Sequence, residues 1–323
     1  MKLGVIGAGR WGVNLIRVCA ELGVLESICE ANEAALATIG AKYPDVALEC
    51  DVPSLLQRNI DAVVVAAPAP LHAELCIEAI AAGKHVFVEK PLAMSPNEAA
   101  TVVRAAQAGG RTLFVGHVLL YHPAVQRMIG LIRDGTIGSV RHLRSRRLSW
   151  GTLRAQENVW WSFAPHDVAL ALAIFDAMPE NASGSLSAFI RPEIADFAYA
   201  DLRFTQGRSA HIEVSWLDPD KSSRVDVFGS RGVLRLLDSR DGATLTFTPC
   251  GSRGTGNEIE LWREESRTVA FTPTEPLGAE LRAFLNVIER GTRSLTDGEH
   301  GQRVVEVLSM LAAHSHPSLE AIA

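Results

Sequence analysis

The chain has 323 residues, of which 47% are hydrophobic and 21% charged, and its formal net charge is −6. This length is typical of two globular domains, and the acidic balance argues against nucleic acid or a membrane surface as a partner. The five cysteines include no Cys-x-x-Cys pair, which predicts neither a disulfide framework nor a zinc site. With no signal peptide and no apolar run of membrane-spanning length, we expect a cytoplasmic protein.

A strand over residues 2–7 leads into a glycine-rich loop and then a helix over about residues 11–22. The loop reads Gly-Ala-Gly-Arg-Trp-Gly, which is the G-x-G-x-x-G motif in the strand–turn–helix context that dinucleotide binding requires. Its glycines allow a tight turn, the approach of a pyrophosphate and close packing of helix on strand. The predicted cofactor-binding residues of this loop are Gly7, Gly9, Arg10, Trp11 and Gly12.

A second strand over residues 25–29 ends in Glu30, 18 residues after Gly12. A carboxylate at about this spacing binds the adenosine ribose 2′-hydroxyl. No arginine follows that would receive a 2′-phosphate, and the carboxylate would repel one. These residues favour NAD over NADP as the cofactor, although Glu30 can also be read as a solvated strand end.

The next strand, residues 60–66, is apolar throughout, as a central parallel strand should be. It is followed by a proline-stiffened loop that suits packing against the nicotinamide ribose, and then by a helix over residues 71–82. His72 in the first turn of that helix is either a cofactor contact or a surface residue. The candidate cofactor contacts here are Ala67, Pro68, Pro70 and His72.

A short apolar strand then ends in Glu89, Lys90 and a proline. Because ligands of parallel α/β sheets lie beyond the carboxyl ends of the strands, a lysine at this point is aimed at the bound ligand. A solvated ion pair is the simpler alternative. A helix over residues 96–107 and a strand over residues 112–116, ending at His117, complete the pattern.

Strands and helices that alternate in this way predict a doubly wound parallel sheet, that is, a Rossmann domain over residues 1–120. Residues 121–323 are expected to form an α+β domain for substrate binding and oligomerisation. That domain should contain a large, mostly antiparallel open sheet, with the C-terminal helices able to pack back on the first domain.

The glycine loop, the acid after the second strand and the segments A-P-x-P-x-H, V-E-K-P and V-G-H together resemble the Gfo/Idh/MocA oxidoreductases over essentially the whole chain. The resemblance implies an NAD-dependent sugar oxidoreductase in which Lys90 lies beside the nicotinamide and the reacting sugar carbon. Glu89 would position Lys90 or border the nicotinamide, and His117 would also lie at the cofactor.

Residues 9–17, 117–123 and 157–167 are similar to the nucleotide-sugar 3-dehydrogenases within that family. This similarity implies oxidation of the C3 hydroxyl of a UDP-sugar, UDP-N-acetylglucosamine above all. The keto product would pass to an aminotransferase that makes a 3-amino sugar, as for lipid A of lipopolysaccharide or a surface polysaccharide.

After a helix over about residues 124–134, the strand over residues 140–150 carries Arg141, Arg144, Arg146 and Arg147, divided between its two faces. A solvated sheet face is the simpler interpretation, and a site for a diphosphate is the alternative. A loop over residues 151–158 follows. The candidate substrate contacts from this region are Tyr121, Arg147, Arg154 and Asn158.

The segment from Trp160 to Asp167 is expected to be a proline-stiffened turn ahead of a helix over residues 168–175. Trp161 can stack on a sugar and His166 can take a proton, since an ordinary histidine pKa lies near 6.5. The wider family usually has D-x-G-x-H-x-x-D here, whereas this chain keeps only the histidine, with Asp167 one residue further on.

From residue 186 onward six short strands are expected, the first over residues 186–190. A polar loop over residues 251–256 and two final helices, over about residues 277–290 and 298–314, are also expected. Helices on one face of the sheet leave the other face open, which predicts a homodimer or homotetramer. No metal site is predicted.

The predicted reaction is hydride transfer from sugar C3 to NAD, with His166 as base and Lys90 stabilising the alkoxide. The reverse assignment, with Lys90 deprotonated by burial, stays open. Two rivals remain: an oxidoreductase acting on a free sugar, an inositol or a dTDP-sugar, and a non-catalytic sensor of NAD or a nucleotide sugar.

Overall fold

The structure is a computed structural model that describes residues 1–312, apart from 152, 155, 156, 240, 241 and 257. The chain divides into two compact units. The first unit comprises Met1–Val118 and Glu275–Glu306, and the second comprises Leu119–Thr274 together with the chain from Val307 onward. Each unit is described by itself below.

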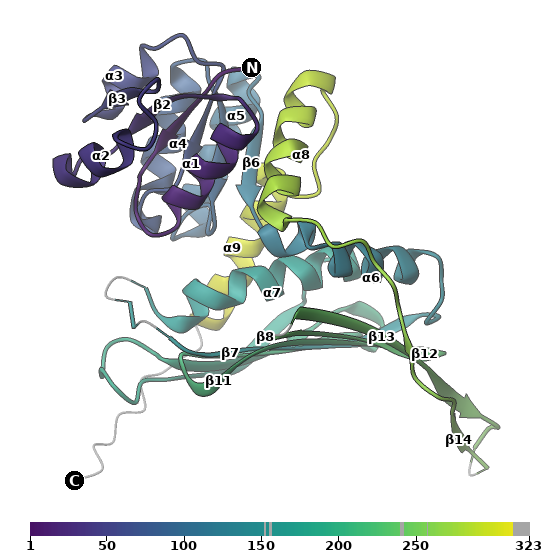
Figure 1. Ribbon diagram of the computed structural model, residues 1–323. Coiled ribbons are helices and arrows are strands. Elements are labelled where there is room, and N and C mark those ends of the chain that lie inside the picture. Colours follow the sequence, from purple (N-terminus) through teal and green to yellow (C-terminus); the bar gives the residue numbers. More distant parts are fainter. Residues whose placement is uncertain (152, 155–156, 240–241, 257, 313–323) are drawn as a thin grey trace. The chain divides into compact units, whose positions relative to one another are not determined.

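The first unit contains a six-stranded parallel sheet with the strand order β3-β2-β1-β4-β5-β6 (Figure 1). The strands are β1 (Leu3–Ile6), β2 (Leu25–Cys29), β3 (Ala47–Glu49), β4 (Ala62–Val65), β5 (His85–Glu89) and β6 (Leu113–Gly116). After β1 the chain adds β2 and β3 on one side of that strand, and it then crosses over to add β4, β5 and β6 on the other side. In a doubly wound sheet such a switch point, at the carboxyl ends of the strands, is where a dinucleotide binds.

Helices cover both faces of this sheet (Figure 1). On one face α1 (Gly12–Glu21) contacts α8 (Pro276–Arg290), and on the other α4 (His72–Ala81) contacts α5 (Pro96–Gly109). Two short helices, α2 (Glu33–Gly40) and α3 (Val52–Leu56), are capped by Asn32 and Asp51, whose side chains accept hydrogen bonds from backbone N–H groups. The apolar strands are therefore buried on both sides.

The edge of the sheet at β6 is covered by a later part of the chain. Phe114 pairs with Asp297, and the backbone N–H of Val115 donates to Thr296 O at 2.8 Å. Phe284 of α8 packs its ring against Phe87 and Phe114, with centroid distances of 5.8 and 5.6 Å. These contacts fix α8, and the segment that leads into α9 (Gly298–Ala312), on the first unit.

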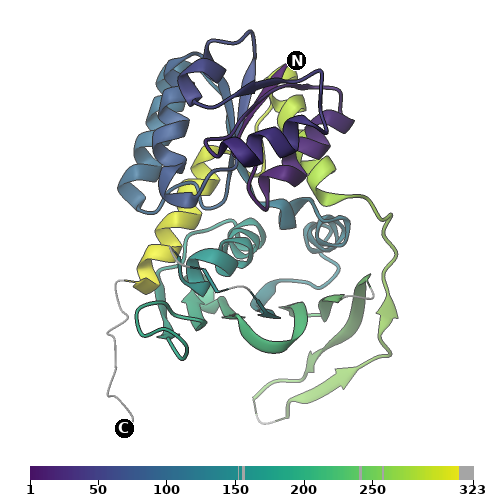
Figure 2. The same ribbon diagram turned by 60° about the vertical axis from the view of Figure 1, so that its left-hand side comes forward.

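The second unit is built on a nine-stranded sheet in which β7 pairs parallel to β10 and the other pairs are antiparallel. The strand order across this sheet is β14-β13-β12-β11-β7-β10-β9-β8, and β15 also pairs with β13. The strands are β7 (Val140–Trp150), β8 (Asn181–Ser187), β9 (Phe197–Arg203), β10 (Ser209–Ser215), β11 (Leu217–Gly229), β12 (Gly232–Ser239), β13 (Gly242–Arg253), β14 (Glu260–Arg263) and β15 (Arg267–Thr268). Figure 2 shows the light green hairpin of β13 and β14 at the edge of the twisted sheet.

Two helices, α6 (Pro123–Arg133) and α7 (Val159–Phe175), lie on one face of this sheet (Figure 1). Burial alternates along β9 and β10, as expected for strands with only one covered face. Within the described part of the second unit, no helix lies on the opposite face, which we call the open face.

The expected fold class, a Rossmann domain followed by an α+β domain with a large antiparallel sheet, is confirmed. Three local expectations were wrong. The turn predicted before residue 168 is helical, because Asn158 caps a helix that starts at Val159 and continues through Pro165. The strand expected at residues 186–190 is β8, which ends at Ser187, because Asp196 instead binds the backbone N–H groups of Phe189 and Ile190.

The loop expected at residues 251–256 begins as strand, since β13 continues to Arg253 and pairs with β14. Two expectations fall partly outside the described residues. These are Thr152, Ala155 and Gln156 of the loop over residues 151–158, and residues 313 and 314 of the last predicted helix.

Candidate active site

The glycine loop takes the conformation that its sequence predicts. Gly7 has φ +98°, and a Cβ there would lie 2.8 Å from the carbonyl oxygen of Ala66. A Cβ at Gly12 would come within 2.1 Å of Gly7 O, whereas one at Gly9 would meet nothing within 4 Å. The loop is thus tightly packed at its ends and open at its centre, where a pyrophosphate needs close access to the backbone.

Glu30 lies beside this loop at the carboxyl end of β2. Its Oε2 accepts a hydrogen bond from Ala8 N at 2.7 Å, and its Oε1 accepts one from Asn32 N at 2.9 Å. The carboxylate is therefore held between the glycine loop and the start of α2. This is the position from which an acidic side chain can receive the two hydroxyls of an adenosine ribose.

The loop after β4 contains Ala67, Pro68 and Pro70, the last within the short 3-10 helix η1 (Ala69–Leu71). His72 is buried rather than on the surface. Its ring nitrogens lie 2.7 Å from Pro91 O and 2.9 Å from Ala67 O. His72 therefore braces the loops that follow β4 and β5 against each other.

Glu89 and Lys90 end β5, as the sequence predicted. Glu89 is 7% exposed, and its Oε1 accepts a hydrogen bond of 2.6 Å from the indole Nε1 of Trp11. Its Oε2 accepts a longer one from Lys90 N at 3.3 Å. Burial raises the pKa of Glu89 to about 7, against the opposing effects of Lys90 and the Trp11 hydrogen bond. Glu89 can thus change its charge near neutral pH.

His117 follows β6 and is buried. Its ring lies edge-on to the ring of His300, with 5.6 Å between the ring centroids. Burial, and after it the charges of His300 and Lys90, lower the pKa of His117 well below its ordinary value. Burial likewise lowers the pKa of His300 to about 4. Both imidazoles are therefore neutral at physiological pH, so neither His117 nor His300 adds a positive charge near Lys90.

These residues of the first unit fit a dinucleotide cofactor. Four features lie together at the carboxyl ends of the strands of one sheet. They are the open glycine loop, the carboxylate of Glu30, the proline-containing loop after β4 and the end of β5 with Glu89 and Lys90. The arrangement leaves Arg10 exposed at the mouth of the loop.

In the second unit, α7 carries three of the predicted substrate contacts. Asn158 is its N-cap and accepts a hydrogen bond from Trp161 N at 3.1 Å. Trp161 is buried in the first turn, and His166 is half-buried two turns into the helix. Trp160, its neighbour, is buried and donates its indole N–H to Leu308 O at 3.0 Å. The helix thus has a firmly anchored beginning.

Arg147 lies on the helix-covered face of β7, where Asp167 of α7 binds it. The guanidinium donates to both carboxylate oxygens, at 2.8 and 3.0 Å, and Ser145 Oγ donates to Oδ1 at 2.6 Å. Although burial acts against it, the carboxylate raises the pKa of Arg147. Asp167 therefore fixes α7, and with it His166, on the sheet.

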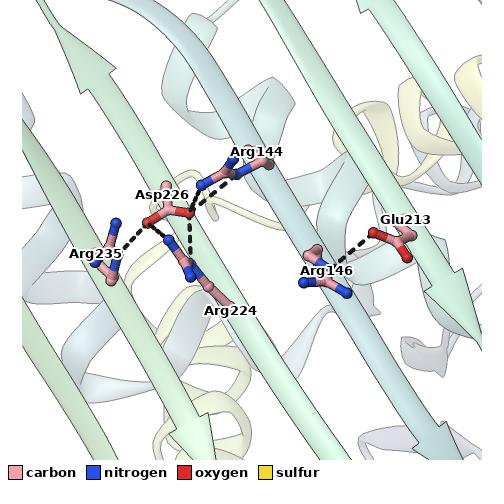
Figure 3. Close-up of polar contacts among 6 residues, drawn as sticks. All are labelled: Arg144, Arg146, Glu213, Arg224, Asp226 and Arg235. Carbon is pink, nitrogen blue, oxygen red and sulfur yellow. Dashed lines mark hydrogen bonds and ion pairs between the residues drawn. The ribbon is translucent and has the colours of Figure 1, made fainter. Parts of the chain in front are cut away.

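Two other arginines of β7, Arg144 and Arg146, point to the open face (Figure 3). Arg144 binds Asp226, which Arg224 and Arg235 also bind, and Arg146 pairs with Glu213 at 2.9 Å. Burial would raise the pKa of Asp226, but the three guanidinium hydrogen bonds keep it below its ordinary value. The predicted division of the arginines between two faces is therefore present, and those on the open face have acidic partners.

Arg154 lies in the loop before α7, where it pairs with Glu157 and its carbonyl oxygen accepts a hydrogen bond from Arg191 at 2.8 Å. Tyr121 ends the 3-10 helix η2 (Val118–Tyr121) and is half-buried.

Sequence reasoning missed two buried ionisable residues of the first unit, Glu280 and His300. Neither belongs to a recognisable motif. The burial of Glu280 could have been predicted from helical spacing, because this acid falls on the same face of α8 as the apolar residues Leu277, Leu281 and Phe284.

Comparison with known proteins matches both parts of the chain to one family. Residues 1–117 match the model described as oxidoreductase family, NAD-binding Rossmann fold, and residues 125–235 match the GFO/IDH/MocA C-terminal domain. The chain belongs to the Gfo/Idh/MocA oxidoreductase family, and its first unit contains the NAD-binding Rossmann domain.

The chain is similar to UDP-N-acetylglucosamine 3-dehydrogenase of Acidithiobacillus ferrooxidans, with 26% identity over 94% of each chain. The solved structure of that enzyme matches with a TM-score of 0.86 over 98% of this chain and 97% of the other. An oxidoreductase structure from Magnetospirillum magnetotacticum is 31% identical, with a TM-score of 0.82 over 96% of this chain and 99% of the other. Myo-inositol 2-dehydrogenase of Thermotoga maritima is 26% identical over 94% of this chain and 92% of its own.

Proposed function

We propose that this protein is an NAD-dependent dehydrogenase that oxidises the C3 hydroxyl of a UDP-sugar, with UDP-N-acetylglucosamine as the substrate. The observation that carries the proposal is the end of β5, where Glu89 and Lys90 follow a buried strand and Trp11 joins them to the glycine loop. A cationic side chain at the cofactor edge of the sheet is suited to an oxygen that becomes negative during hydride transfer.

Bound NAD supplies the acceptor for the hydride that leaves sugar C3. Lys90 as an ammonium donates a hydrogen bond to the reacting oxygen and stabilises its alkoxide character. Glu89 in its ionised form keeps Lys90 protonated, because opposite charges at short range favour each other.

The hydroxyl proton goes to His166 of the second unit. An imidazole is a suitable base because its ordinary pKa lies near the working pH. Asp167, the next residue on α7, orients the helix through Arg147 and so sets the position of His166. The reverse assignment, with Lys90 as the base, requires a neutral lysine.

The choice of a UDP-sugar rests on the similarity to the Acidithiobacillus enzyme along nearly the whole of both chains. Candidate contacts for it are Tyr121, Arg154, Asn158 and Trp161, with Arg147 held close to α7 by Asp167. The similarity to myo-inositol 2-dehydrogenase favours a free polyol as the second candidate substrate.

We also propose that a second copy of the chain covers the open face of the second unit, giving a homodimer or homotetramer. The face combines the exposed Tyr199 and Leu237 with the arginine–acid pairs of Figure 3. The 3-keto product would be consumed by an aminotransferase in 3-amino-sugar synthesis in the cytoplasm. Among the described residues no helix has both the length and the apolar character needed to cross a membrane.

The test is a panel of UDP-sugars, dTDP-sugars, free sugars and inositols, each supplied with NAD, with reduced nicotinamide followed by its absorbance. We expect the highest kcat/KM with UDP-N-acetylglucosamine. Turnover restricted to free polyols would overturn the substrate assignment, and the absence of turnover with every alcohol would overturn the enzymatic one.

A further inference from the structure

The far end of the β13–β14 hairpin extends beyond the rest of the sheet in the second unit. The pairing of β12 with β13 ends at Pro249, and the backbone N–H of Cys250 makes a final hydrogen bond to Arg231 O at 3.3 Å. Beyond it, residues 251–253 pair with β14 and with no other described strand. We call residues 251–253 and 258–263 the arm. Figure 1 shows β14 leaving the sheet on the side away from α6 and α7.

The arm is a two-stranded ribbon with apolar side chains in water. Its guanidinium of Arg253 lies over the ring of Trp262, 5.3 Å from the centroid. Leu261 is 81% exposed and Ile259 is 59% exposed. A two-stranded ribbon is only marginally stable unless a further strand or a packed face supports it, and an exposed edge strand with apolar side chains favours association with another chain. The arm therefore has the character of a contact element.

The arm and the residues directly after it are acidic. Residues 251–265 contain four glutamates against two arginines. Glu264 pairs with Arg267 at 2.9 Å. The other three, Glu258, Glu260 and Glu265, are exposed, and no ion pair joins them to any residue that the structure describes. The surface that the arm fits should therefore combine apolar area with an excess of positive charge.

The open face of the same unit has such a surface. The carboxylate of Asp226 is bound by three guanidinium groups, those of Arg144, Arg224 and Arg235 (Figure 3). We call these four residues the arginine cluster. One carboxylate balances only one of the three positive charges, so the cluster keeps an excess of two. Leu237, which lies opposite Arg224 in the register of β12 with β11, is exposed beside it.

The arm does not reach the arginine cluster of its own chain. Arg235 of the cluster lies opposite Thr246 of β13. The arm begins five residues further along β13, at Gly251, and runs outward from there. At about 3.4 Å per residue, even its nearest part lies about 17 Å along the strand from Arg235. The glutamates of the arm can therefore meet such a cluster only in another molecule.

We propose that the arm of one copy of this chain packs on the open face of a second copy and places its glutamates at the arginine cluster there. The proposal rests on the open-face interface proposed above and adds the segment that binds the second copy. Each copy offers one arm and one cluster, so in a two-fold assembly the contact forms twice. Leu261 and Ile259 cover the apolar area beside the cluster, which includes Leu237.

The experiment uses two variants of the full-length protein, each altered on one side of the contact. The arm variant carries Glu258→Lys and Glu260→Lys. The cluster variant carries Arg224→Gln and Arg235→Gln, and it keeps Arg144 as the partner of Asp226. Sedimentation velocity over a range of concentrations gives the Kd of the dimer. If each contact contributes about tenfold, either variant alone should dimerise about 100-fold more weakly than the wild type, because both of its contacts are altered.

Mixing the two variants gives the decisive measurement. A mixed dimer brings the unaltered arm of the cluster variant onto the unaltered cluster of the arm variant, so one of its two contacts is intact. We expect the mixed dimer to form about tenfold more tightly than the dimer of either variant alone. If the mixture dimerises no better than its components, the arm does not meet the cluster and the proposal is wrong.

Two further variants keep the test independent of folding and of overall charge. Leu261→Ser changes an exposed side chain of the arm and should weaken the dimer about tenfold. Glu74→Lys with Glu78→Lys makes the same change of charge as the arm variant at exposed positions of α4, and it should leave the Kd unchanged.

The possible failures can be told apart. A wild type that dimerises, with arm variants that dimerise equally well, would overturn the role of the arm and leave the open-face interface standing. A wild type that stays a single chain at every concentration would overturn both. Failure of the proposed dehydrogenase activity would appear separately, as absent turnover in a wild type whose dimer still depends on the arm.

Discussion

Trp11 donates its indole N–H to Glu89 at 2.6 Å and so joins the glycine-rich loop to the end of β5, although 78 positions separate the two residues. The bond links the glycine-rich loop, where we expect the pyrophosphate to bind, to the strand end that carries Lys90. The fifth position of the G-x-G-x-x-G motif is therefore occupied here by a side chain, Trp11, that forms a hydrogen bond at the candidate active site.

Replacing Trp11 by phenylalanine removes this donor while keeping an aromatic ring. Because a hydrogen bond to a charged group contributes about 1.5–3 kcal/mol, the ionised form of Glu89 loses stability and its pKa rises from about 7. If ionised Glu89 is the active form, the rise of kcat/KM with pH should move upward by about one unit. Trp150→Phe, at a residue 71% exposed in the second unit, should leave the profile unchanged. A downward or absent shift in Trp11→Phe would contradict the account.

Glu30→Ala should weaken the preference for NAD over NADP. The carboxylate is positioned beside the glycine loop by Ala8 N and Asn32 N, where it can bind a ribose 2′-hydroxyl and repel a 2′-phosphate. We expect the ratio of kcat/KM for the two cofactors to fall by about 10- to 100-fold. Glu33→Ala, at an exposed position in the first turn of α2, is the control. An unchanged ratio would show that Glu30 is only a strand end.

Two neighbouring arginines of β7 should differ in their effect on stability. Arg147→Met leaves the buried carboxylate of Asp167 without its cation, which should cost about 3–5 kcal/mol in the free energy of unfolding. Arg146→Gln breaks a pair whose side chains are 44% and 23% exposed, so it should cost less than about 1 kcal/mol. Denaturant unfolding of the two variants measures both values, and equal losses would refute the distinction.

Lys90→Ala and His166→Ala should each remove turnover while NAD binding, measured by fluorescence titration, stays within about threefold of the wild type. Loss of a group that stabilises a developing oxyanion typically lowers kcat by about 10²–10³-fold, and loss of a general base by about 10²–10⁴-fold. A variant that keeps near-normal kcat would show that its residue has no chemical role.

The first unit could be predicted closely from sequence because its signals are local. One signal is the glycine motif between a strand and a helix, and another is an apolar strand that ends in charged residues such as Glu89 and Lys90. Both can be recognised without knowledge of distant contacts. His72 shows the limit of this reasoning. Its burial depends on carbonyl groups from two separate loops, and no sequence pattern reports that they converge on one ring.

The beginning of α7 was missed because Pro165 was taken to stiffen a turn ahead of the helix. Asn158 supplies a cap and Trp160 anchors the first turn through Leu308, so the helix continues through Pro165. The charge pattern of β7 correctly indicated two faces. Two features that the sequence pattern does not report determine what each arginine binds. One is the register with β11, which sets Asp226 opposite Arg144, and the other is the packing of α7 on the sheet, which brings its Asp167 to Arg147.

The most direct test of the central claim follows the hydrogen that leaves the sugar. The protein is incubated with NAD and UDP-N-acetylglucosamine carrying deuterium at C3, and the reduced nicotinamide is analysed by mass spectrometry. The account predicts that the deuterium appears in the reduced cofactor. Reduced cofactor without the label would place the oxidation at another carbon, and no reduced cofactor would contradict dehydrogenation of this substrate altogether.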